Sequence, residues 1–190
     1  GSRYDRWAYQ GDDAAMSLSA KRGLDLFFSE QLECFHCHGG FNFALSTTFE
    51  GLNDVPVAFQ NTGLYNIDGE GAYPVGATGL YEFTGAPEDM GKFRTMSLRN
   101  ITVTGPYLHD GTAATLDEVL DIYAAGGRVI ESGDNMGDGT KNPHKSGFVN
   151  GFVLTDQQRI DVRAFLESLT DETFLTDPAL SDPFVPADTN

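Results

Sequence analysis

Cysteine and positive charge are both scarce in this chain. Two cysteines in 190 residues exclude a framework of several disulfides and a four-thiolate zinc site. Only 12 Lys and Arg stand against 28 Asp and Glu, a formal net charge of −16, which excludes nucleic-acid binding as the main function. A basic partner or a cation fits this charge, and an acidic surface that serves only solubility is equally open. No apolar run is long enough to cross a membrane, and no signal-peptide core opens the sequence.

Both cysteines belong to one short motif. Cys34 and Cys37 are three positions apart, and His38 follows directly, which is the attachment signature of c-type haem. Each thiol can bond one vinyl group of a porphyrin, and the imidazole can coordinate the iron from one face. A redox dithiol and half of a zinc site are the alternatives, but the sequence lacks the alternating strands and helices of a thioredoxin-like fold. The motif predicts one covalent haem c.

The rest of the chain predicts an all-α, cytochrome c-type haem domain with long loops. The 22 glycines and 8 prolines leave few long periodic segments, so a buried porphyrin would supply much of the apolar interior. Ser17 or Ser19 can cap a first helix that runs to about Glu33, and Gly23 permits close approach on one face of it. Residues 39–94 are expected to form an ordered long loop or short hairpins around the haem edge.

Two capping boxes predict the later helices. Thr115 with Glu118 begins a helix that ends near Ala125 at a Gly-Gly pair, and Thr155 with Gln158 begins one that runs to about residue 169. We expect the last helix to pack against the first. Domain boundaries follow: residues 1–16 as an N-terminal linker that opens with the remnant of a tag, 17–170 as the haem domain, and 171–190 as an extended tail.

Several separated motifs carry a family likeness. They are GKFRTMSLRNITVTGPYLHDG at 91–111 with the helix that follows it, RGLDLFF at 22–28, and CFHCHGGFNF at 34–43. Together they strongly resemble the C-terminal half of bacterial dihaem cytochrome c peroxidases and MauG-type enzymes. NPHKSGFV at 142–149 looks most like the branch of MbnH-like dihaem enzymes. The likeness covers roughly residues 4–170, with the motifs in the order of the family.

The resemblance implies what the chain does. Those enzymes carry one haem in each half, whereas this chain has one attachment motif, so it corresponds to the electron-transfer half. The whole enzyme would use peroxide to oxidise a protein partner, and this half would work with an N-terminal haem half or a second haem protein. Its location would be periplasmic, because bacteria assemble haem c outside the cytoplasmic membrane. A stand-alone monohaem electron-transfer cytochrome c and a haem-free structural fragment are the alternatives.

The second axial ligand of the iron decides potential and reactivity. By the resemblance, Tyr123 falls where MauG-like enzymes carry a ligating tyrosine and classical dihaem peroxidases carry methionine. Met136, in a Gly- and Asp-rich loop, is the soft-donor alternative. His109 is favoured as a residue that hydrogen-bonds a propionate or the backbone beside the haem, not as a ligand. His36, inside the motif, and His144, in a loop, are weaker candidates.

The remaining candidates are cationic, carbonyl or aromatic groups. Arg94 and Arg99 can neutralise haem propionates, although an ordinary surface pairing is equally open for each. The resemblance places the backbone carbonyls of Thr104 and Pro106 where the family holds calcium between its two haems, so calcium is a possible second cofactor. Trp7 is a candidate for electron hopping, but a role in packing is favoured for it.

Overall fold

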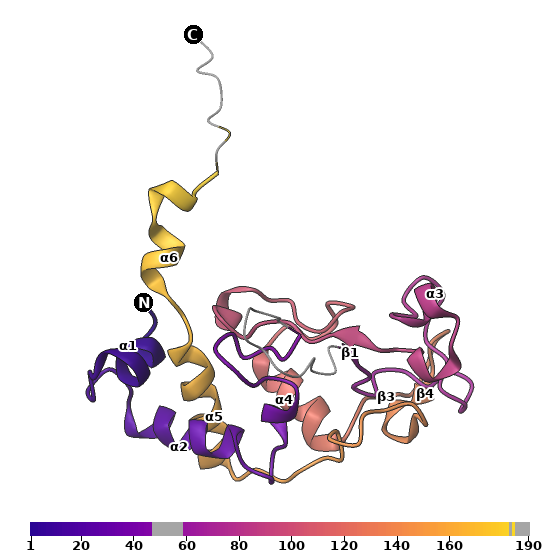
Figure 1. Cartoon of the computed structure of the whole chain (residues 1–190). Coiled ribbons are helices and arrows are strands. Elements are labelled where there is room, and N and C mark those ends of the chain that lie inside the picture. The colour runs from indigo at the N-terminus through magenta and orange to yellow at the C-terminus, as the bar shows by residue number, and fades with distance from the viewer. Residues whose placement is uncertain (47–58, 183, 185–190) are drawn as a thin grey trace.

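The computed structural model describes residues 1–46, 59–182 and 184. Its fold within these residues is mainly helical, with short strands (Figure 1). The α-helices are α1 (Arg3–Gln10), α2 (Leu18–Phe27), α3 (Tyr81–Thr84), α4 (Leu116–Ala125), α5 (Asp156–Ser168) and α6 (Glu172–Thr176). The 3-10 turns are η1 (Cys34–His36), η2 (Pro87–Asp89), η3 (Ile101–Val103), η4 (Gly139–Lys141) and η5 (Pro178–Leu180).

Helices α2 and α5 form the main helix pair. Ser17 caps α2 by accepting the amide of Ala20, as the sequence predicts, but α2 ends at Phe27 and turns lead from there to the cysteines. Thr155 begins α5 with the predicted capping box. The helices approach most closely at Gly23, where a Cβ atom would lie 1.8 Å from the Asp161 carbonyl oxygen of α5. Only glycine permits this crossing.

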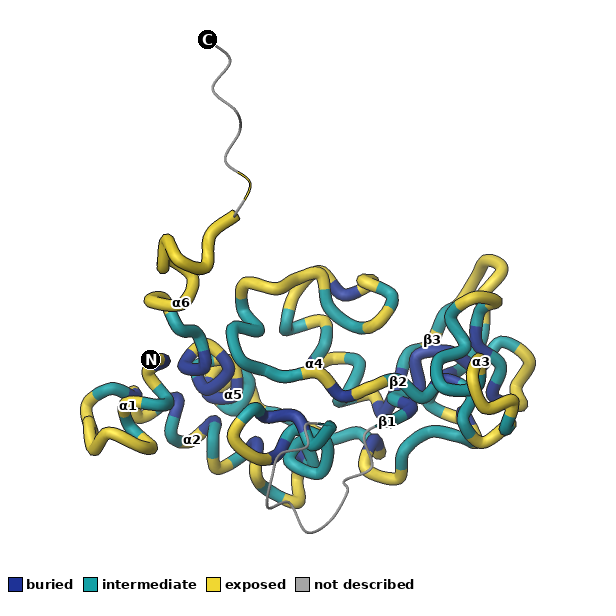
Figure 2. The backbone as a smooth tube through the Cα atoms, turned by 45° about the horizontal axis from the view of Figure 1, so that its top comes forward, coloured by how far each residue is buried: buried dark blue, intermediate teal, exposed yellow. Residues whose placement is uncertain are grey.

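The main apolar cluster is built around this pair, and Figure 2 shows buried residues along α5. Phe165 and Leu169 are fully shielded from solvent. Helix α1 adds Tyr4 and Trp7 to the rim of the cluster. The segment expected as a linker therefore contains a helix that packs on the core, which corrects the expectation for residues 3–10. The signal was present, because Ser2 and Asp5 form a capping box of their own.

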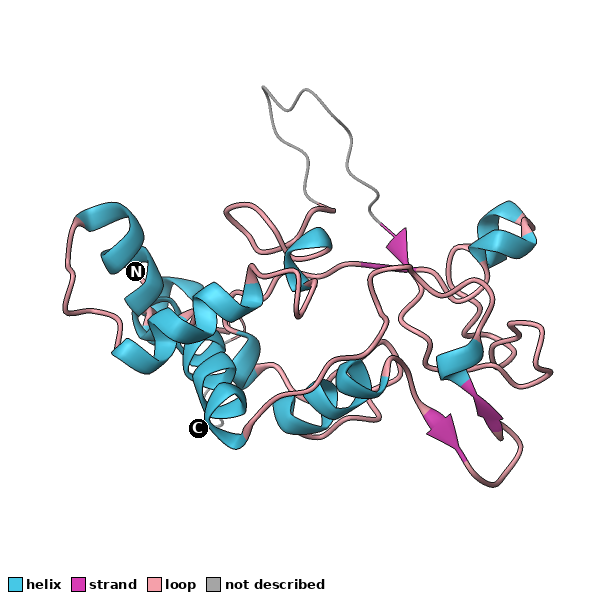
Figure 3. Ribbon diagram, turned by 90° about the horizontal axis from the view of Figure 1, so that it is seen from below, coloured by secondary structure: helices cyan, strands magenta, loops and turns pink. Residues whose placement is uncertain are grey.

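The strands lie away from the helix pair and form two short antiparallel ladders (Figure 3). Strand β1 (Phe59–Gln60) pairs with β2 (Phe93–Arg94), and β3 (Val129–Ile130) pairs with β4 (Gly137–Asp138). Within 39–94 the β1–β2 ladder joins two strands that are far apart in the sequence, so it closes a long loop and is not a short hairpin. Residues 47–58 of that segment lie outside the described residues. The fold is not purely helical.

A second, smaller apolar cluster lies at this end of the molecule. It consists of Leu64, Tyr65 and Tyr73 with partly buried neighbours. Helix α4 joins the two clusters, because its Leu120 belongs to the first and its Ile122 packs on the second. Thr115 caps α4 and Gly126 ends it, as predicted, although the Glu118 carboxylate accepts the amide of the preceding alanine and not that of the cap residue.

The C-terminal segment is more structured than the expected extended tail. Asp171 caps the short helix α6 by accepting two backbone amides, and η5 follows. Figure 1 shows α6 leading away from the body of the molecule. Within the described residues, no helix has the length and apolar character that a membrane span requires.

Candidate functional site

The haem-attachment motif lies on a tight turn. Cys34 opens η1, and its carbonyl oxygen accepts the amides of Cys37 at 3.2 Å and His38 at 2.9 Å. Both cysteines are half-buried and neither forms a disulfide. The turn thus brings the two thiols and the imidazole together, as the spacing predicts.

His38 is oriented by a hydrogen bond from its ring. Nδ1 lies 3.0 Å from the carbonyl oxygen of Phe43, whose side chain belongs to the main apolar cluster. A proton on Nδ1 makes it the donor of this bond, which leaves Nε2 unprotonated, and the Met96 backbone is a second neighbour of the ring. This is the arrangement that fixes the tautomer and orientation of a metal-ligating histidine. Burial lowers the pKa of His38, so the imidazole is neutral, as a ligand must be.

The thiols have the electrostatics of buried groups. Burial raises the pKa of Cys34 to about 12 and that of Cys37 to about 11. Reactive dithiols have lowered thiol pKa values, as do thiolate metal sites. The two thiols therefore lack the lowered pKa of a reactive redox dithiol.

Tyr123 lies on α4, the helix that contacts both apolar clusters. Its residue is half-buried, and burial raises the pKa of its phenol, with the neighbouring Cys37 and Cys34 thiols adding to the effect. It also lines a small pocket together with Glu33 and Phe148. The structure thus brings Tyr123 to the haem motif. A phenol without a cation stays protonated there, and iron would supply the charge that a tyrosinate needs.

The competing ligands lie elsewhere. Met136 is 56% exposed in the turn that joins β3 to β4. His144 packs against the backbone at Gly71, far along the chain from the motif. His109 stacks on Phe93 with ring centroids 3.6 Å apart, and it belongs to the aromatic group around the second cluster. None of the three forms a described contact with His38.

The two candidate arginines have protein partners. Arg99 donates to the Asp5 carboxylate at 2.7 Å and to the Phe41 carbonyl oxygen, and its guanidinium lies over the Phe43 ring. Arg99 therefore links α1 to the segment that follows the motif. This is the ordinary surface pairing that the sequence leaves open beside a role at a haem propionate. Arg94 is exposed, and its Nε donates to the Ser46 hydroxyl at 3.2 Å. A propionate role is a prediction that neither contact tests.

The calcium candidates and Trp7 remain predictions as well. Thr104 and Pro106 are exposed residues beyond η3, and a cis peptide bond joins Gly105 to Pro106. Trp7 packs at the rim of the main cluster, with the Lys21 ammonium over its ring at 5.6 Å. Its surroundings are those of a packing residue.

One cluster beside the motif is not evident from the sequence. His36 stacks between two phenylalanines, with centroids 4.0 Å from both Phe35 and Phe148, and its Nε2 lies 2.7 Å from a Glu33 carboxylate oxygen. Glu30 also approaches the imidazole at 4.0 Å. Phe148 comes from a distant loop, so only the fold brings it here.

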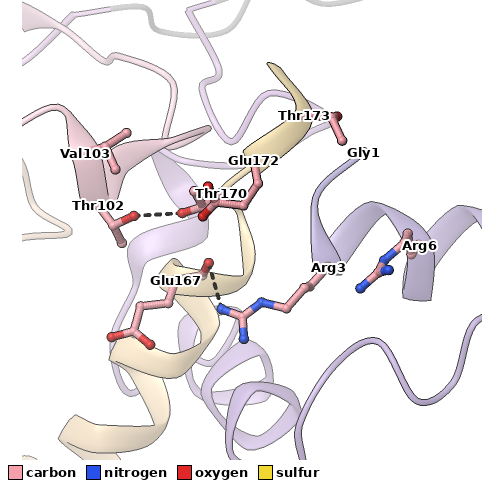
Figure 4. Close-up of a pocket in the computed structure, with 9 residues that line it drawn as sticks. All are labelled: Gly1, Arg3, Arg6, Thr102, Val103, Glu167, Thr170, Glu172 and Thr173. Carbon is pink, nitrogen blue, oxygen red and sulfur yellow. Dashed lines mark hydrogen bonds between the residues drawn. The ribbon is translucent and has the colours of Figure 1, made fainter. Parts of the chain in front are cut away.

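A different pocket lies between the N-terminal helix α1 and the end of α5. It has a volume of about 540 Å³ and is lined by residues of α1, η3, the end of α5 and α6 (Figure 4). Arg3 donates to the Glu167 carbonyl oxygen across it. It contains none of the residues predicted for the haem site.

A mainly helical fold that presents two thiols and an oriented histidine on one turn defines a c-type haem protein. Comparisons with known proteins make the assignment specific. The chain is 38% identical to the cytochrome-c peroxidase IdrP1 of Denitromonas iodatirespirans over 97% of its own length and 48% of that protein. It is 31% identical to the methylamine utilization protein MauG of Methylorubrum extorquens, over 89% of this chain and 39% of that protein.

A solved structure gives the same result. A MauG-like protein associated with microbial copper homeostasis superposes with a TM-score of 0.90 at 49% identity, over 96% of this chain and 51% of that one. A scan against protein-family models finds no match. The chain belongs to the family of bacterial dihaem cytochrome c peroxidases and MauG-like proteins. It spans about half the length of these relatives.

Proposed function

We propose that this chain is a c-type haem redox domain, the electron-transfer half of a MauG-like dihaem peroxidase that uses peroxide to oxidise a protein partner in the periplasm. The observation that carries the proposal is the turn at Cys34, Cys37 and His38, with Nδ1 of the histidine held by the Phe43 carbonyl oxygen. The family membership supports it. The partner of this half would be an N-terminal haem half or a second haem protein.

The residues of this chain have separable tasks. Cys34 and Cys37 would each add their S–H across one vinyl group, so that two thioether bonds anchor the cofactor. His38 would present Nε2 to the iron, while its Nδ1 proton stays on the bond to Phe43. Tyr123 would approach from α4 as the second ligand after losing its phenolic proton. The bound haem supplies one-electron chemistry, and its potential depends on these ligands.

A second function remains open, that of a stand-alone monohaem electron carrier. Tyr123 lies near both cysteines. As a second ligand it would fill the iron site, which suits electron transfer without peroxide chemistry. The two functions differ in whether a second haem works with this one, because both use the haem of this chain in the same way.

Peroxide turnover separates them. The haem-loaded chain is assayed with hydrogen peroxide and a reduced electron donor, alone and as part of the full-length protein. We expect reversible one-electron redox chemistry but negligible turnover from the chain alone, and turnover from the full-length protein. A full-length protein with both haems in place and no turnover would contradict the peroxidase proposal, whereas a natural protein that carries this haem alone would be the electron carrier.

A further inference from the structure

Three side chains beside the motif bring metal-ligating atoms to one point. The carboxylate oxygens of Glu30 and Glu33 and a ring nitrogen of His36 all lie within 4.8 Å of one another. His36 Nε2 is 2.7 Å from Glu33 Oε2 and 4.0 Å from Glu30 Oε2. The proposed haem attachment uses none of these three groups.

The closest contact in this cluster is not a hydrogen bond. Glu33 Oε2 is shielded from solvent and has no hydrogen-bond partner among the described residues, although His36 Nε2 is only 2.7 Å away. Because the contact lacks the angle of a hydrogen bond, no proton lies in line between the two atoms, and their lone pairs repel each other. A cation that contacts both atoms replaces this repulsion with attraction and satisfies the buried oxygen. The unpartnered oxygen therefore points to a bound ion.

No lysine or arginine supplies the positive charge. In the part of the chain that the structure describes, the ion-pair partner of both Glu30 and Glu33 is His36. Glu30 has 80% of its side chain accessible, so an ion can enter from solvent on that side. A small cavity of about 120 Å³, lined in part by the two glutamates, has room for water molecules that would complete a coordination shell.

The imidazole of the cluster is already held in position. Its ring lies between Phe35 and Phe148, with centroid distances of 4.0 Å to each, and it is nearly parallel to Phe148. The backbone beside it is fixed as well, because the Ser29 carbonyl oxygen accepts the amide of Glu33 at 3.0 Å. A ligand group that is ordered beforehand loses little conformational entropy when it binds. The fold thus prepares His36 and Glu33 to hold an ion.

We propose that Glu30, Glu33 and His36 form a binding site for a divalent transition-metal ion of the zinc class. One imidazole nitrogen and two carboxylate oxygens would be the protein ligands, and water would fill the open positions. The donor set selects this class, because imidazole suits zinc and its neighbours in the first transition series, whereas magnesium and calcium prefer oxygen ligands alone. The site goes beyond the proposed function, since it needs neither the haem nor electron transfer.

Isothermal titration calorimetry of the haem-loaded chain with zinc chloride tests the site. In the haem-loaded chain both thiols are thioethers, so they do not compete for zinc. We expect one tightly bound zinc ion per chain and little binding of magnesium at the same concentrations. His36→Gln should weaken zinc binding at least about tenfold, because losing even an outer hydrogen bond to a metal ligand has an effect of that size. His144→Gln, which replaces another half-buried histidine, is the control and should bind zinc like the unchanged chain.

A second pair of variants tests the carboxylates. Glu30→Gln with Glu33→Gln keeps the size of both side chains and removes their charge, and it should also weaken zinc binding at least about tenfold. Glu82→Gln with Glu88→Gln makes the same change on exposed residues of α3 and η2, and it should change the affinity less than about twofold. No zinc binding by the unchanged chain, or equal affinities in the cluster variants and their controls, would overturn the site.

The test can also be made without the haem, which separates this inference from the proposed function. If the chain takes up no haem, iodoacetamide blocks both thiols and the same titration is repeated. A haem-free chain that binds zinc through the cluster contradicts the proposed function alone. A haem-loaded chain that binds no zinc contradicts the metal site alone.

Discussion

At the scale of single residues, the site depends on groups whose surroundings fix their chemistry. His38 is neutral and oriented because it is buried and bonded to Phe43. Tyr123 is protonated in the absence of iron because its phenol is buried near two thiols. The same low-dielectric surroundings that penalise an isolated tyrosinate would strengthen its bond to a ferric ion.

Replacing Tyr123 with Phe tests the second ligand. The hydroxyl is the only group removed, so the ferric absorption spectrum should lose its tyrosinate-to-iron charge-transfer band and the reduction potential should rise. Met136→Leu and Tyr107→Phe serve as controls, and both should leave the spectrum unchanged. A spectrum that ignores Tyr123→Phe and responds to Met136→Leu would reverse the assignment.

Asp161 gives a prediction about pH. This nearly inaccessible carboxylate on α5 accepts from the Arg22 guanidinium at 2.7 Å and from Ser19, both on α2. These hydrogen bonds lower its pKa from the ordinary 3.8 to about 2. Because the folded-state pKa is lowered, the stabilisation is complete above about pH 4 and is lost as the pH falls towards 2.

We therefore expect Asp161→Asn to reduce the free energy of unfolding by about 1–2 kcal/mol at pH 7, a value that allows for the exposure of the Arg22 partner. The difference between variant and unchanged chain should shrink steadily between pH 4 and pH 2.5 in urea titrations. Asp12→Asn, on the exposed loop after α1, is the control and should show no such trend. A difference that is constant with pH would refute the ion-pair explanation.

At the scale of elements, the crossing of α2 and α5 depends on Gly23. A methyl group there would overlap the α5 backbone, and a backbone cannot rotate away as a side chain can. Gly23→Ala should therefore cost about 3 kcal/mol or more of unfolding free energy. Gly147→Ala is the matched control, because nothing lies within 4 Å of its Cβ position, and it should change stability by less than about 0.5 kcal/mol. Chemical denaturation of the haem-loaded chain measures the free energy of unfolding of both variants. Equal values for Gly23→Ala and Gly147→Ala would show that α2 and α5 can move apart to make room for the methyl group.

The sequence predicts those elements whose signals are local. Caps at Ser17, Thr115 and Thr155 act within one turn of the helix they begin, and the structure confirms all three. The attachment motif is equally local. Helix α1 was missed although Ser2 and Asp5 form a capping box, because one short helix at a terminus has little periodicity to support the signal. Its fixation depends on Arg99, which is 94 residues away from Asp5.

The surroundings of the site could not be predicted in the same way. Phe148 meets His36 only because the loop before α5 returns to the motif, and nothing in either segment specifies that contact. For the same reason, the sequence does not specify which residue pairs with Arg99. The helix caps can be predicted because their signals are local, whereas pairings between distant segments require the fold.

At the scale of the whole molecule, the apolar interior is divided. One cluster surrounds α2 and α5, the other surrounds Leu64, and α4 connects them. A haem held by the motif and by α4 would join these clusters into one interior. The cofactor would then contribute to folding as well as to chemistry.

Loss of the haem should accordingly loosen one part of the molecule more than the other. In hydrogen exchange, the chain made without haem should keep protected amides in α2 and α5, while α4 and residues 64–73 exchange much faster than in the haem-loaded chain. The amides of α5 provide the internal control. Uniform protection in both forms would show that the two clusters do not need the cofactor.

Covalent haem attachment is the claim on which the whole account depends. The direct measurement is the mass of the intact chain produced with a haem-attachment system, together with its pyridine haemochrome spectrum. The account predicts a mass increase of one haem that survives denaturation and a spectrum typical of two thioether bonds, both lost in a Cys34→Ala, Cys37→Ala variant. Two free thiols and no bound porphyrin in the unchanged chain would contradict it.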